Sequence, residues 1–153
     1  MSSSIAAQVQ SKSFKFVLKT LLSHNVPEIT VPAAAKLQDE AIFLDAREHE
    51  EYEVSHLPNA RFTGYNHFNE KVVQDLPKNA TIVVYCAVGK RSENISQRLL
   101  KQGFTNVQNL YGGIFEWVNQ GHAVYDVNNK PVNKVHAYSR LWGRFVDRGE
   151  KVY

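Results

Sequence analysis

The sequence contains little cysteine and no long hydrophobic run. Its one cysteine, Cys86, cannot form an internal disulfide, and a zinc site built from several cysteines is excluded. No apolar run approaches the roughly 18 residues of a membrane-spanning helix, so we expect no membrane partner. Polar residues interrupt every stretch near the N-terminus that could serve as a secretory signal. Together with a lone free thiol, this predicts a cytoplasmic protein.

The composition is that of an ordinary globular protein. Hydrophobic residues make up 43% and charged residues 22% of the 153 positions, which excludes disorder over most of the length and fits one domain. The formal net charge of +3 permits an anionic substrate but does not by itself indicate nucleic acid, and we expect no nucleic-acid partner. The six histidines form no pair at metal-ligand spacing, so we expect no metal.

Short apolar runs alternate with helix-forming stretches through the middle of the chain. The runs expected to form strands are residues 28–31, 41–44, 81–85 and 104–110. The stretches expected to form helices are residues 33–37, 48–54, 91–102 and 114–119. This alternation predicts an α/β fold with a mostly parallel central sheet flanked by helices. The acidic stretch 48–53 is interpreted as a solvated helix face.

The two ends of the chain carry amphipathic patterns. Apolar residues recur at helical spacing from Phe14 to Leu22, after Ser13 as a possible N-cap, and we interpret them as a packing helix outside any site. The residues before this helix are expected to be a loose lead-in. From Val135 to Val146, apolar and aromatic residues share one helical face and arginines share another, which predicts a helical extension. This extension could cover the active site, mediate a dimer or only pack against the domain.

The residue with the clearest chemical potential is Cys86, which directly follows an expected buried strand. It begins the sequence Cys86-Ala-Val-Gly-Lys-Arg-Ser92, where a helix pattern starts. Ligands bind at the carboxyl ends of parallel strands, and a helix N-terminus there offers free N–H groups and partial positive charge. Gly89 allows the loop to curl, while Lys90 and Arg91 add positive charge. An inert buried cysteine is the alternative, but these features favour an activated thiolate in an anion-binding loop.

The spacing within this loop bears on the kind of anion. Arg91 stands five positions after Cys86, which gives the pattern C-x4-R. Cysteine phosphatases have C-x5-R at the same kind of strand-to-helix junction. The present loop is one residue too short for a phosphate to sit inside it, whereas a single sulfur atom carried on Cys86 is smaller and would fit. The spacing therefore favours sulfur transfer over phosphoryl transfer.

Three stretches of the chain resemble the rhodanese family. Residues 86–92 are similar to the family loop C-x-x-G-x-R-S. Residues 45–60 resemble the family stretch D-x-R-x-x-x-E-[FY]-x-x-G-H-I-P-G-A, except that Ser55 and Asn59 stand where the family has glycine. Residues 110–117 are similar to L-x-G-G-x-x-x-W. Both departures lie outside the catalytic loop, and asparagine tolerates the left-handed conformation that glycine often supplies.

The resemblance implies a single-domain sulfurtransferase of the three-layer rhodanese-like fold. It divides the chain into an N-terminal lead-in and helix (1–27), a catalytic domain (28–122) and a C-terminal extension (123–153). Cys86 would attack the outer sulfur of a donor such as thiosulfate and become a persulfide. A thiol, cyanide or a thiol carrier protein would then accept the sulfur in a ping-pong second step. No cofactor is implied beyond this covalent persulfide.

The resemblance also implies roles for particular residues. Those implied to bind the donor or the persulfide are Ala87, Val88, Gly89, Lys90, Arg91 and Ser92. Asp45 and Arg47 are implied to support the loop through a strand-end ion pair, and His56 to anchor a turn by hydrogen bonds. A binding or sulfur-sensing module with little turnover remains an alternative. A cysteine phosphatase or arsenate reductase is a further one, disfavoured by the loop length.

Overall fold

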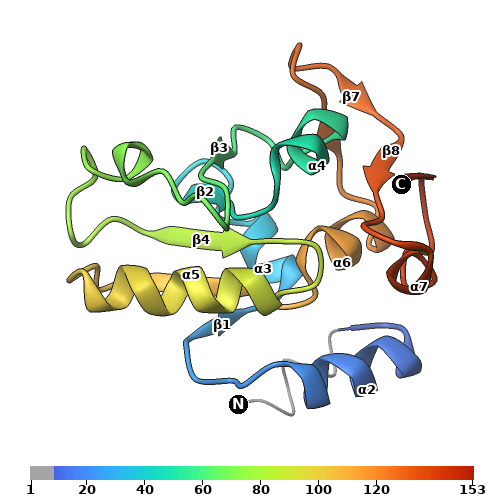
Figure 1. The fold of residues 1–153 in the computed structure, drawn as a ribbon, viewed down its shortest axis with the longest axis horizontal. Helices are drawn as coiled ribbons and strands as arrows, with labels where there is room; N and C mark the ends of the chain where they lie inside the picture. Colours follow the sequence, from blue (N-terminus) through green and yellow to red (C-terminus); the bar gives the residue numbers. More distant parts are fainter. Residues whose placement is uncertain (1–8) are drawn as a thin grey trace.

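A five-stranded sheet organises the fold (Figure 1). The structure is a computed structural model and describes residues 9–153. The strands are β1 (Glu28–Ile29), β2 (Ile42–Asp45), β3 (Arg61–Phe62), β4 (Ile82–Tyr85) and β5 (Val107–Leu110). Their order in the sheet is β1-β5-β4-β2-β3, and every neighbouring pair runs parallel. The prediction of an α/β fold with a mostly parallel central sheet is confirmed.

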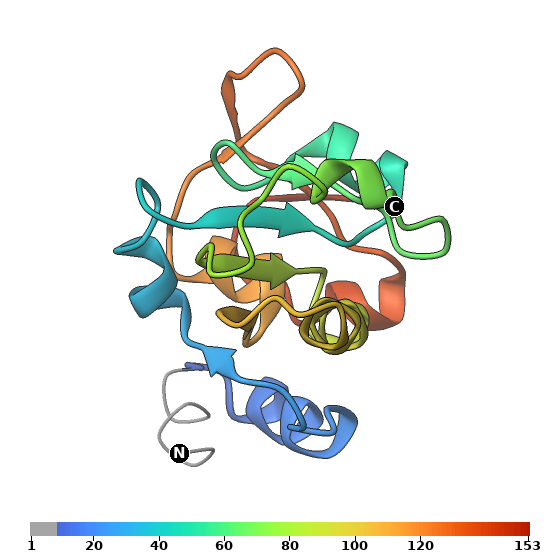
Figure 2. The same cartoon turned by 90° about the vertical axis from the view of Figure 1, so that its left-hand side faces the viewer.

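Helices cover both faces of this sheet, and Figure 2 shows two of them, α3 and α5, on opposite sides of the strands. The helices of the middle of the chain are α3 (Val31–Ala35), α4 (His49–Val54), η1 (Glu70–Val72), α5 (Lys90–Lys101) and α6 (Gly113–Asn119). All four residues of β4 are buried, because its side chains alternate between two hydrophobic cores. Val83 and Tyr85 face α3 and α6, whereas Ile82 and Val84 face α5. Burial on both faces explains why this strand is a continuous apolar run.

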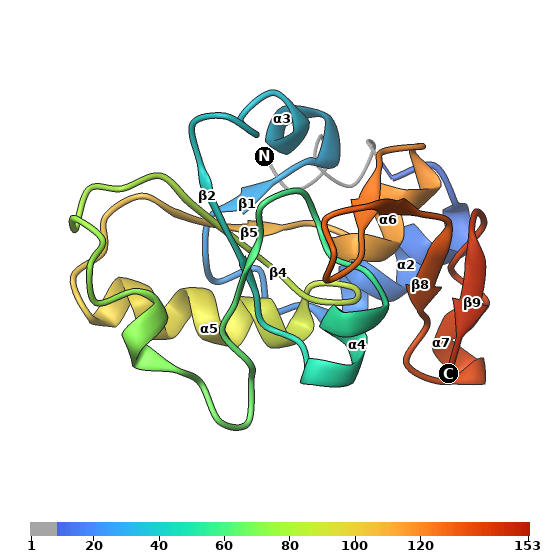
Figure 3. The ribbon, with the colours of Figure 1, turned by 90° about the horizontal axis from the view of Figure 1, so that it is seen from above.

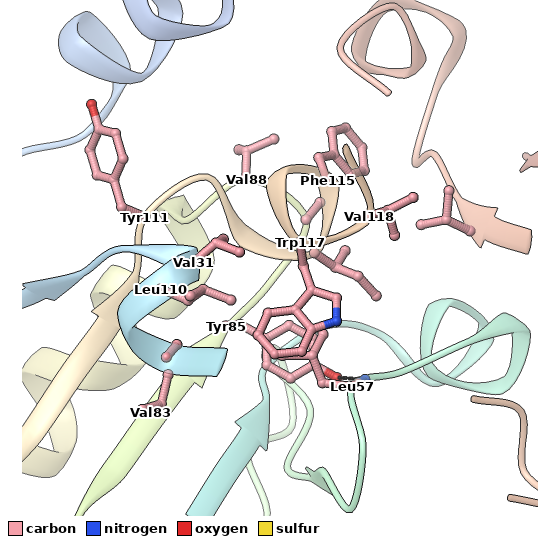
Figure 4. Close-up of a cluster of buried hydrophobic side chains, with 14 of the residues drawn as sticks. Val31, Leu57, Val83, Tyr85, Val88, Leu110, Tyr111, Phe115, Trp117 and Val118 are labelled. Atoms are coloured by element: carbon pink, nitrogen blue, oxygen red, sulfur yellow. Dashed lines mark hydrogen bonds between the residues drawn. The ribbon is translucent and has the colours of Figure 1, made fainter. Parts of the chain in front are cut away.

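The larger core lies under α6 and is centred on aromatic side chains (Figure 4). Trp117 and Tyr85 are fully buried there, and Trp117 packs edge-on against Phe43 with ring centroids 6.3 Å apart. The indole Nε1–H donates to the carbonyl of Ala123 at 3.0 Å, which satisfies its only polar atom. The packing of this core holds α6 against the loop that follows β4.

The N-terminal helix α2 (Lys12–Leu21) begins two residues earlier than predicted. Ser11, not Ser13, is its N-cap, because the Ser11 hydroxyl accepts a hydrogen bond from the Phe14 N–H at 3.3 Å. Phe14 is fully buried, as expected for a packing helix. The prediction of a loose lead-in is wrong for Val9, which is only 1% exposed and belongs to the core. The rest of that prediction, on residues 1–8, lies outside the described residues.

The predicted C-terminal helix is wrong. The segment instead forms strand β8 (Lys134–His136), the four-residue helix α7 (Arg140–Gly143) and strand β9 (Glu150–Val152), with β8 and β9 paired in parallel. Before them, β6 (Val124–Tyr125) pairs with β7 (Pro131–Val132) in an antiparallel hairpin.

A period-two pattern explains this outcome. Buried Val135 and Ala137 alternate with the less buried Lys134 and His136, which is the signature of a strand with one buried face. The pairing partner β9 lies more than a dozen residues downstream, so the local pattern could not reveal it. Tyr138 then adopts the left-handed conformation with φ of 68°, which ends the strand and prevents a continuous helix.

The arginines of the extension also differ from the prediction, because they do not keep to a separate face. The guanidinium carbon of Arg140 lies 4.7 Å from the ring centre of Tyr153, and that of Arg144 lies 4.9 Å from the ring of Phe145. Seen from above, β8, β9 and α7 stand beside α2 and α4, at the end of the sheet where β4 stops and α5 begins (Figure 3). Within residues 9–153, no helix has both the length and the apolar content to span a bilayer.

Candidate active site

Cys86 lies at the centre of a hydrogen-bonded cradle between β4 and α5. The Gly89 N–H donates to Cys86 Sγ at 3.2 Å, and the Ser92 N–H donates at 3.4 Å. The Ser92 hydroxyl lies 3.3 Å from the same sulfur. Gly89 has φ of 123°, a conformation that turns its N–H towards the sulfur and that side chains rarely permit. The cradle thus directs donors at the one nucleophilic atom, at the N-terminal end of a twelve-residue helix.

Asn109, near the end of β5, completes the cradle and is not among the residues predicted for the site. Its Nδ2 donates to the Gly89 carbonyl at 2.9 Å, which fixes the amide so that Oδ1 is an acceptor facing the Ser92 hydroxyl at 2.6 Å. The single hydroxyl hydrogen of Ser92 can therefore go to Asn109 or to a Cys86 thiolate, but not to both. The available signal was a polar residue at the carboxyl end of the strand beside β4.

The glycine pair at the start of α6, Gly112 and Gly113, lets this helix approach the loop. The Ile114 N–H donates to the Cys86 carbonyl at 2.9 Å, and the Phe115 N–H donates to the Ala87 carbonyl at 3.1 Å. Gly113 has φ of 60°, and a Cβ placed on it would lie 2.4 Å from the Ala87 carbonyl oxygen. The downstream motif of residues 110–117 therefore contacts the cysteine loop directly, and its glycine is required by close backbone contact.

Asp45 and Arg47 form the ion pair predicted at the end of β2. Both side chains are fully buried, and Asp45 accepts from Arg47 Nε at 2.9 Å and from Nη2 at 2.7 Å. The Tyr85 hydroxyl donates to Asp45 at 2.7 Å and accepts from the Leu57 N–H at 3.1 Å, the contact drawn in Figure 4. Burial opposes the charged form of Arg47, but the charge and hydrogen bonds of Asp45 outweigh it and raise the pKa of the guanidinium. The pair thereby joins β2, β4 and the turn before β3.

The two departures from the family pattern cause no strain. Ser55 has φ of −168°, extended backbone that any residue adopts, and its carbonyl accepts from Arg47 Nη2 at 2.7 Å. Asn59 has φ of 58°, the left-handed conformation that asparagine tolerates. His56 Nδ1 lies 3.1 Å from the Tyr52 carbonyl and its backbone pairs with Tyr125, so its predicted role as a turn anchor is confirmed.

Both cations of the loop are paired with carboxylates rather than left free. The Arg91 guanidinium makes a bidentate contact with Glu51 at 2.7 and 2.8 Å. Lys90 Nζ lies 3.3 Å from the carboxylate of Glu93. Glu51 is only 3% exposed, so the interpretation of residues 48–53 as a solvated face is wrong at this position. Burial alone would raise the pKa of Glu51, but the hydrogen bonds and charge of Arg91 outweigh it and lower that pKa.

Replacing Glu51 with glutamine should therefore change how stability depends on pH. The pKa of Glu51 is lower in the folded than in the unfolded protein, where it is ordinarily 4.5. The contribution of Glu51 to the free energy of unfolding is therefore complete above the unfolded pKa and is lost as pH falls through the folded pKa. We expect Glu51→Gln to lower the free energy of unfolding by about 2 kcal/mol at neutral pH and by less in acid. Urea unfolding at a series of pH values measures this difference.

The matched control is Glu53→Gln on the same helix. Glu53 contacts His49 through two largely exposed side chains, so its removal should cost less than about 1 kcal/mol at any pH. A constant difference between wild type and Glu51→Gln across the acid range would contradict the role assigned to the Arg91 contact.

A cavity of about 170 Å³ opens beside the cradle. The residues that line it are Leu21, Cys86, Ala87, Val88, Lys90, Arg91, Tyr138 and Trp142. Of the roles left open for the C-terminal extension, covering the candidate active site is the one that the structure supports, because the extension supplies the aromatic side chains Tyr138 and Trp142 to the cavity wall. Leu21 belongs to α2, so the interpretation of that helix as lying outside any site is wrong there. Cys86 is only 1% exposed, and a reagent would reach it through this cavity.

The geometry also decides which predicted residues come together. Ala87, Val88, Lys90 and Arg91 line the cavity, Gly89 and Ser92 hold the sulfur, and Asp45 and Arg47 stand behind the loop without lining the cavity. Among the side chains of residues 9–153, no group of histidine, cysteine, aspartate or glutamate is arranged to hold a metal ion.

Sequence comparison matches the same region to known proteins. The model of the rhodanese-like domain family matches residues 31–120. A curated relative from Pectobacterium carotovorum, named tRNA uridine(34) hydroxylase, is 37% identical over 89 residues, which cover 55% of this chain and 25% of that protein. The protein of the same name from Salmonella typhimurium is 39% identical over 95 residues, covering 58% of this chain and 27% of its own. The chain thus spans about a quarter of the length of these relatives.

Solved structures share the fold. A rhodanese-related protein from Thermoplasma volcanium is 26% identical, with a TM-score of 0.58 over 64% of this chain and 96% of its own. A thiosulfate sulfurtransferase from Pseudomonas aeruginosa is 20% identical, with a TM-score of 0.63 over 93% of this chain and 26% of its own, and this likeness concerns the fold alone. The family match covers more than half of the chain and includes the whole cysteine loop, so this chain belongs to the rhodanese-like domain family.

Proposed function

We propose that the protein is a sulfurtransferase that carries sulfane sulfur on Cys86. The observation that carries the proposal is the cradle, in which the N–H groups of Gly89 and Ser92 donate to Sγ and the Ser92 hydroxyl lies 3.3 Å from it. Such donors stabilise a thiolate and, after transfer, the terminal sulfur of a persulfide. The same anion would be far less stable in an apolar pocket without donors.

The reaction would run in two steps, with a small anionic sulfur donor and a thiol acceptor as partners. The Cys86 thiolate attacks the outer sulfur of thiosulfate, the S–S bond of the donor breaks, and sulfite leaves with the bonding pair. A thiolate, free or on a carrier protein, or cyanide then attacks the terminal sulfur of the persulfide and restores the Cys86 thiolate. Sulfur enters and leaves without a net oxidant, reductant or cofactor.

Loop residues would divide this work. Gly89 and Ser92 hold the reacting sulfur, and Asn109 orients the Ser92 hydroxyl. Asp45 and Arg47 act as positioning residues, because they hold the loop from behind. The curated relatives are named as hydroxylases, but this chain spans only about a quarter of their length. The proposal therefore rests on the cysteine loop and not on the name of those relatives.

Intact-mass measurement before and after exposure to thiosulfate tests the proposal. We expect wild-type protein to gain one sulfur atom, to lose it to dithiothreitol or cyanide, and to form thiocyanate catalytically when cyanide is supplied. Cys86→Ser is the control and should gain nothing. Failure of the wild type to gain sulfur from thiosulfate and also from an organic thiosulfonate would refute the transferase. A stable adduct without turnover would favour the sulfur-sensing module, and hydrolysis of a generic phosphate ester would favour the phosphatase.

A further inference from the structure

We propose that the cavity beside Cys86 is a subsite for an apolar group of the sulfur donor. The protein would then prefer organic sulfane donors, such as aromatic thiosulfonates, to inorganic thiosulfate. This inference rests on the proposed transfer of sulfur by Cys86 and names the class of donor.

The chemistry of the cavity wall favours an apolar group. Opposite the cysteine loop, the wall consists of Leu21, Tyr138 and Trp142, and Val88 adds a further apolar side chain from the loop itself. Thiosulfate has no apolar surface to place against these side chains, and a wall of this kind offers its sulfonate oxygens few partners. An aromatic or aliphatic group would remove its own surface and that of the wall from water.

The charge around the cavity favours a monoanionic donor over a dianion. Lys90 and Arg91 are the cations that line the cavity, and each contacts a carboxylate, Glu93 and Glu51 respectively. Their positive charge is therefore largely balanced before a donor arrives. A dianion such as thiosulfate gains less from such a site than from free cations, whereas a thiosulfonate carries a single negative charge that the cradle N–H groups can hold.

The size of the cavity suits a single ring. Apolar cavities of about 150 Å³ bind benzene in other proteins. The cavity here has about 170 Å³, so a ring-sized group fits beside the sulfur.

The aromatic wall is also held in place. Tyr138 keeps its left-handed conformation although it is bulky, with its N–H donating to His136 Nδ1 at 3.0 Å and its ring 5.1 Å from the Arg91 guanidinium carbon. Such residues persist where the surrounding structure holds them, and they are common at ligand sites. Trp142 packs against Phe145 with ring centroids 5.8 Å apart. Both wall residues lie outside the stretch 31–120 that the family model matches, so this subsite is an addition of this chain.

The reaction balances with such a donor. The Cys86 thiolate attacks the terminal sulfur of benzenethiosulfonate and forms the persulfide S–S bond. The bond from that sulfur to the sulfonyl sulfur breaks, and benzenesulfinate leaves with the electron pair. The acceptor thiolate then takes the sulfur as it would after thiosulfate.

The test compares benzenethiosulfonate with methanethiosulfonate, two monoanions that differ in the size of the apolar group. The measured quantity is kcat/KM for benzenethiosulfonate divided by kcat/KM for methanethiosulfonate, with one acceptor thiol. This ratio should fall roughly tenfold in Tyr138→Asn and in Trp142→Phe or Trp142→Ala, because a large apolar contact is lost. Tyr138→Asn removes the ring while keeping a residue that tolerates the left-handed backbone. Leu141→Ala is the matched control, since Leu141 is exposed on the same helix and does not line the cavity.

The outcomes separate this inference from the proposed function. A ratio that falls in the wall variants but not in Leu141→Ala supports the subsite. An unchanged ratio in the wall variants, with a sulfur adduct still formed on Cys86, overturns the subsite and leaves the transferase standing. No adduct on Cys86 from any of the three donors overturns both. Thermal unfolding of each variant identifies any loss of activity that comes from misfolding. If the Trp142 variants misfold, the ratio measured in Tyr138→Asn tests the subsite, because Tyr138 is exposed and its replacement should not disturb the fold.

Discussion

Replacing Asp45 with asparagine is expected to lower the free energy of unfolding by about 3–5 kcal/mol, a large part of the stability of a domain this size. The carboxylate accepts hydrogen bonds from Arg47 and Tyr85, and both members of the ion pair are fully buried. Asparagine leaves the guanidinium charged and without a counter-charge in the interior. Removing one partner of such a pair costs more than the pair itself contributes.

Urea unfolding of a double-mutant cycle measures this effect. Arg47→Met should be similarly destabilising, but the double variant should lose clearly less than the sum of the two, because no unpaired charge then remains. Asp75→Asn is the control. Asp75 forms a largely exposed ion pair with Arg61, so this substitution should lower the free energy of unfolding by less than about 1 kcal/mol. Additive losses, or a loss of under about 1 kcal/mol for Asp45→Asn, would contradict the scaffold role of this pair.

Gly113→Ala is expected to have the other large effect, on stability and on the rate of sulfur transfer. The new Cβ would lie 2.4 Å from the Ala87 carbonyl oxygen and 2.5 Å from that of Cys86, both backbone atoms of the cysteine loop. We expect a loss of about 3 kcal/mol, the combined cost of a left-handed alanine and of overpacking. Displacing the loop by about 1 Å should slow transfer about a hundredfold.

The control for this variant separates backbone strain from steric contact. Gly103, at the end of α5, also has a positive φ, of 96°, but its Cβ would meet only the Lys78 side chain at 4.0 Å. Gly103→Ala should therefore cost about 1–2 kcal/mol and leave the transfer rate unchanged. Equal losses of stability in the two variants, or an unchanged rate in Gly113→Ala, would show that α6 does not hold the loop as described.

Much of the fold was predictable because its signals are local. The strand 82–85 is an uninterrupted apolar run, and burial on both faces of a parallel sheet requires such a run. The helix that follows it differs from the predicted one by a single residue at each end, 90–101 against 91–102. The cradle was predictable for the same reason, since Cys86, Gly89 and Ser92 lie within seven consecutive residues.

Errors arose where a contact joins residues far apart in the sequence. The pairing of β8 with β9 is one case, and the local pattern of apolar residues there fits a helix as well as a strand. The contact of Arg91 with Glu51 is another, because it spans 40 residues and turns an apparently solvated acid into a buried one. The position of Asn109 beside Ser92 depends on the order of strands in the sheet, which short-range patterns do not encode.

The sequence by itself determined the candidate nucleophile, the α/β architecture and the family, because these depend on residue type and short spacing. Only the tertiary structure decided what stands in front of the nucleophile. Leu21, Tyr138 and Trp142 come from the two ends of the chain and meet over the Cys86 loop, and Glu51 balances the charge of Arg91 there. Folding alone brings these groups within contact distance, so the apolar subsite that we propose for the donor is a property of the assembled molecule.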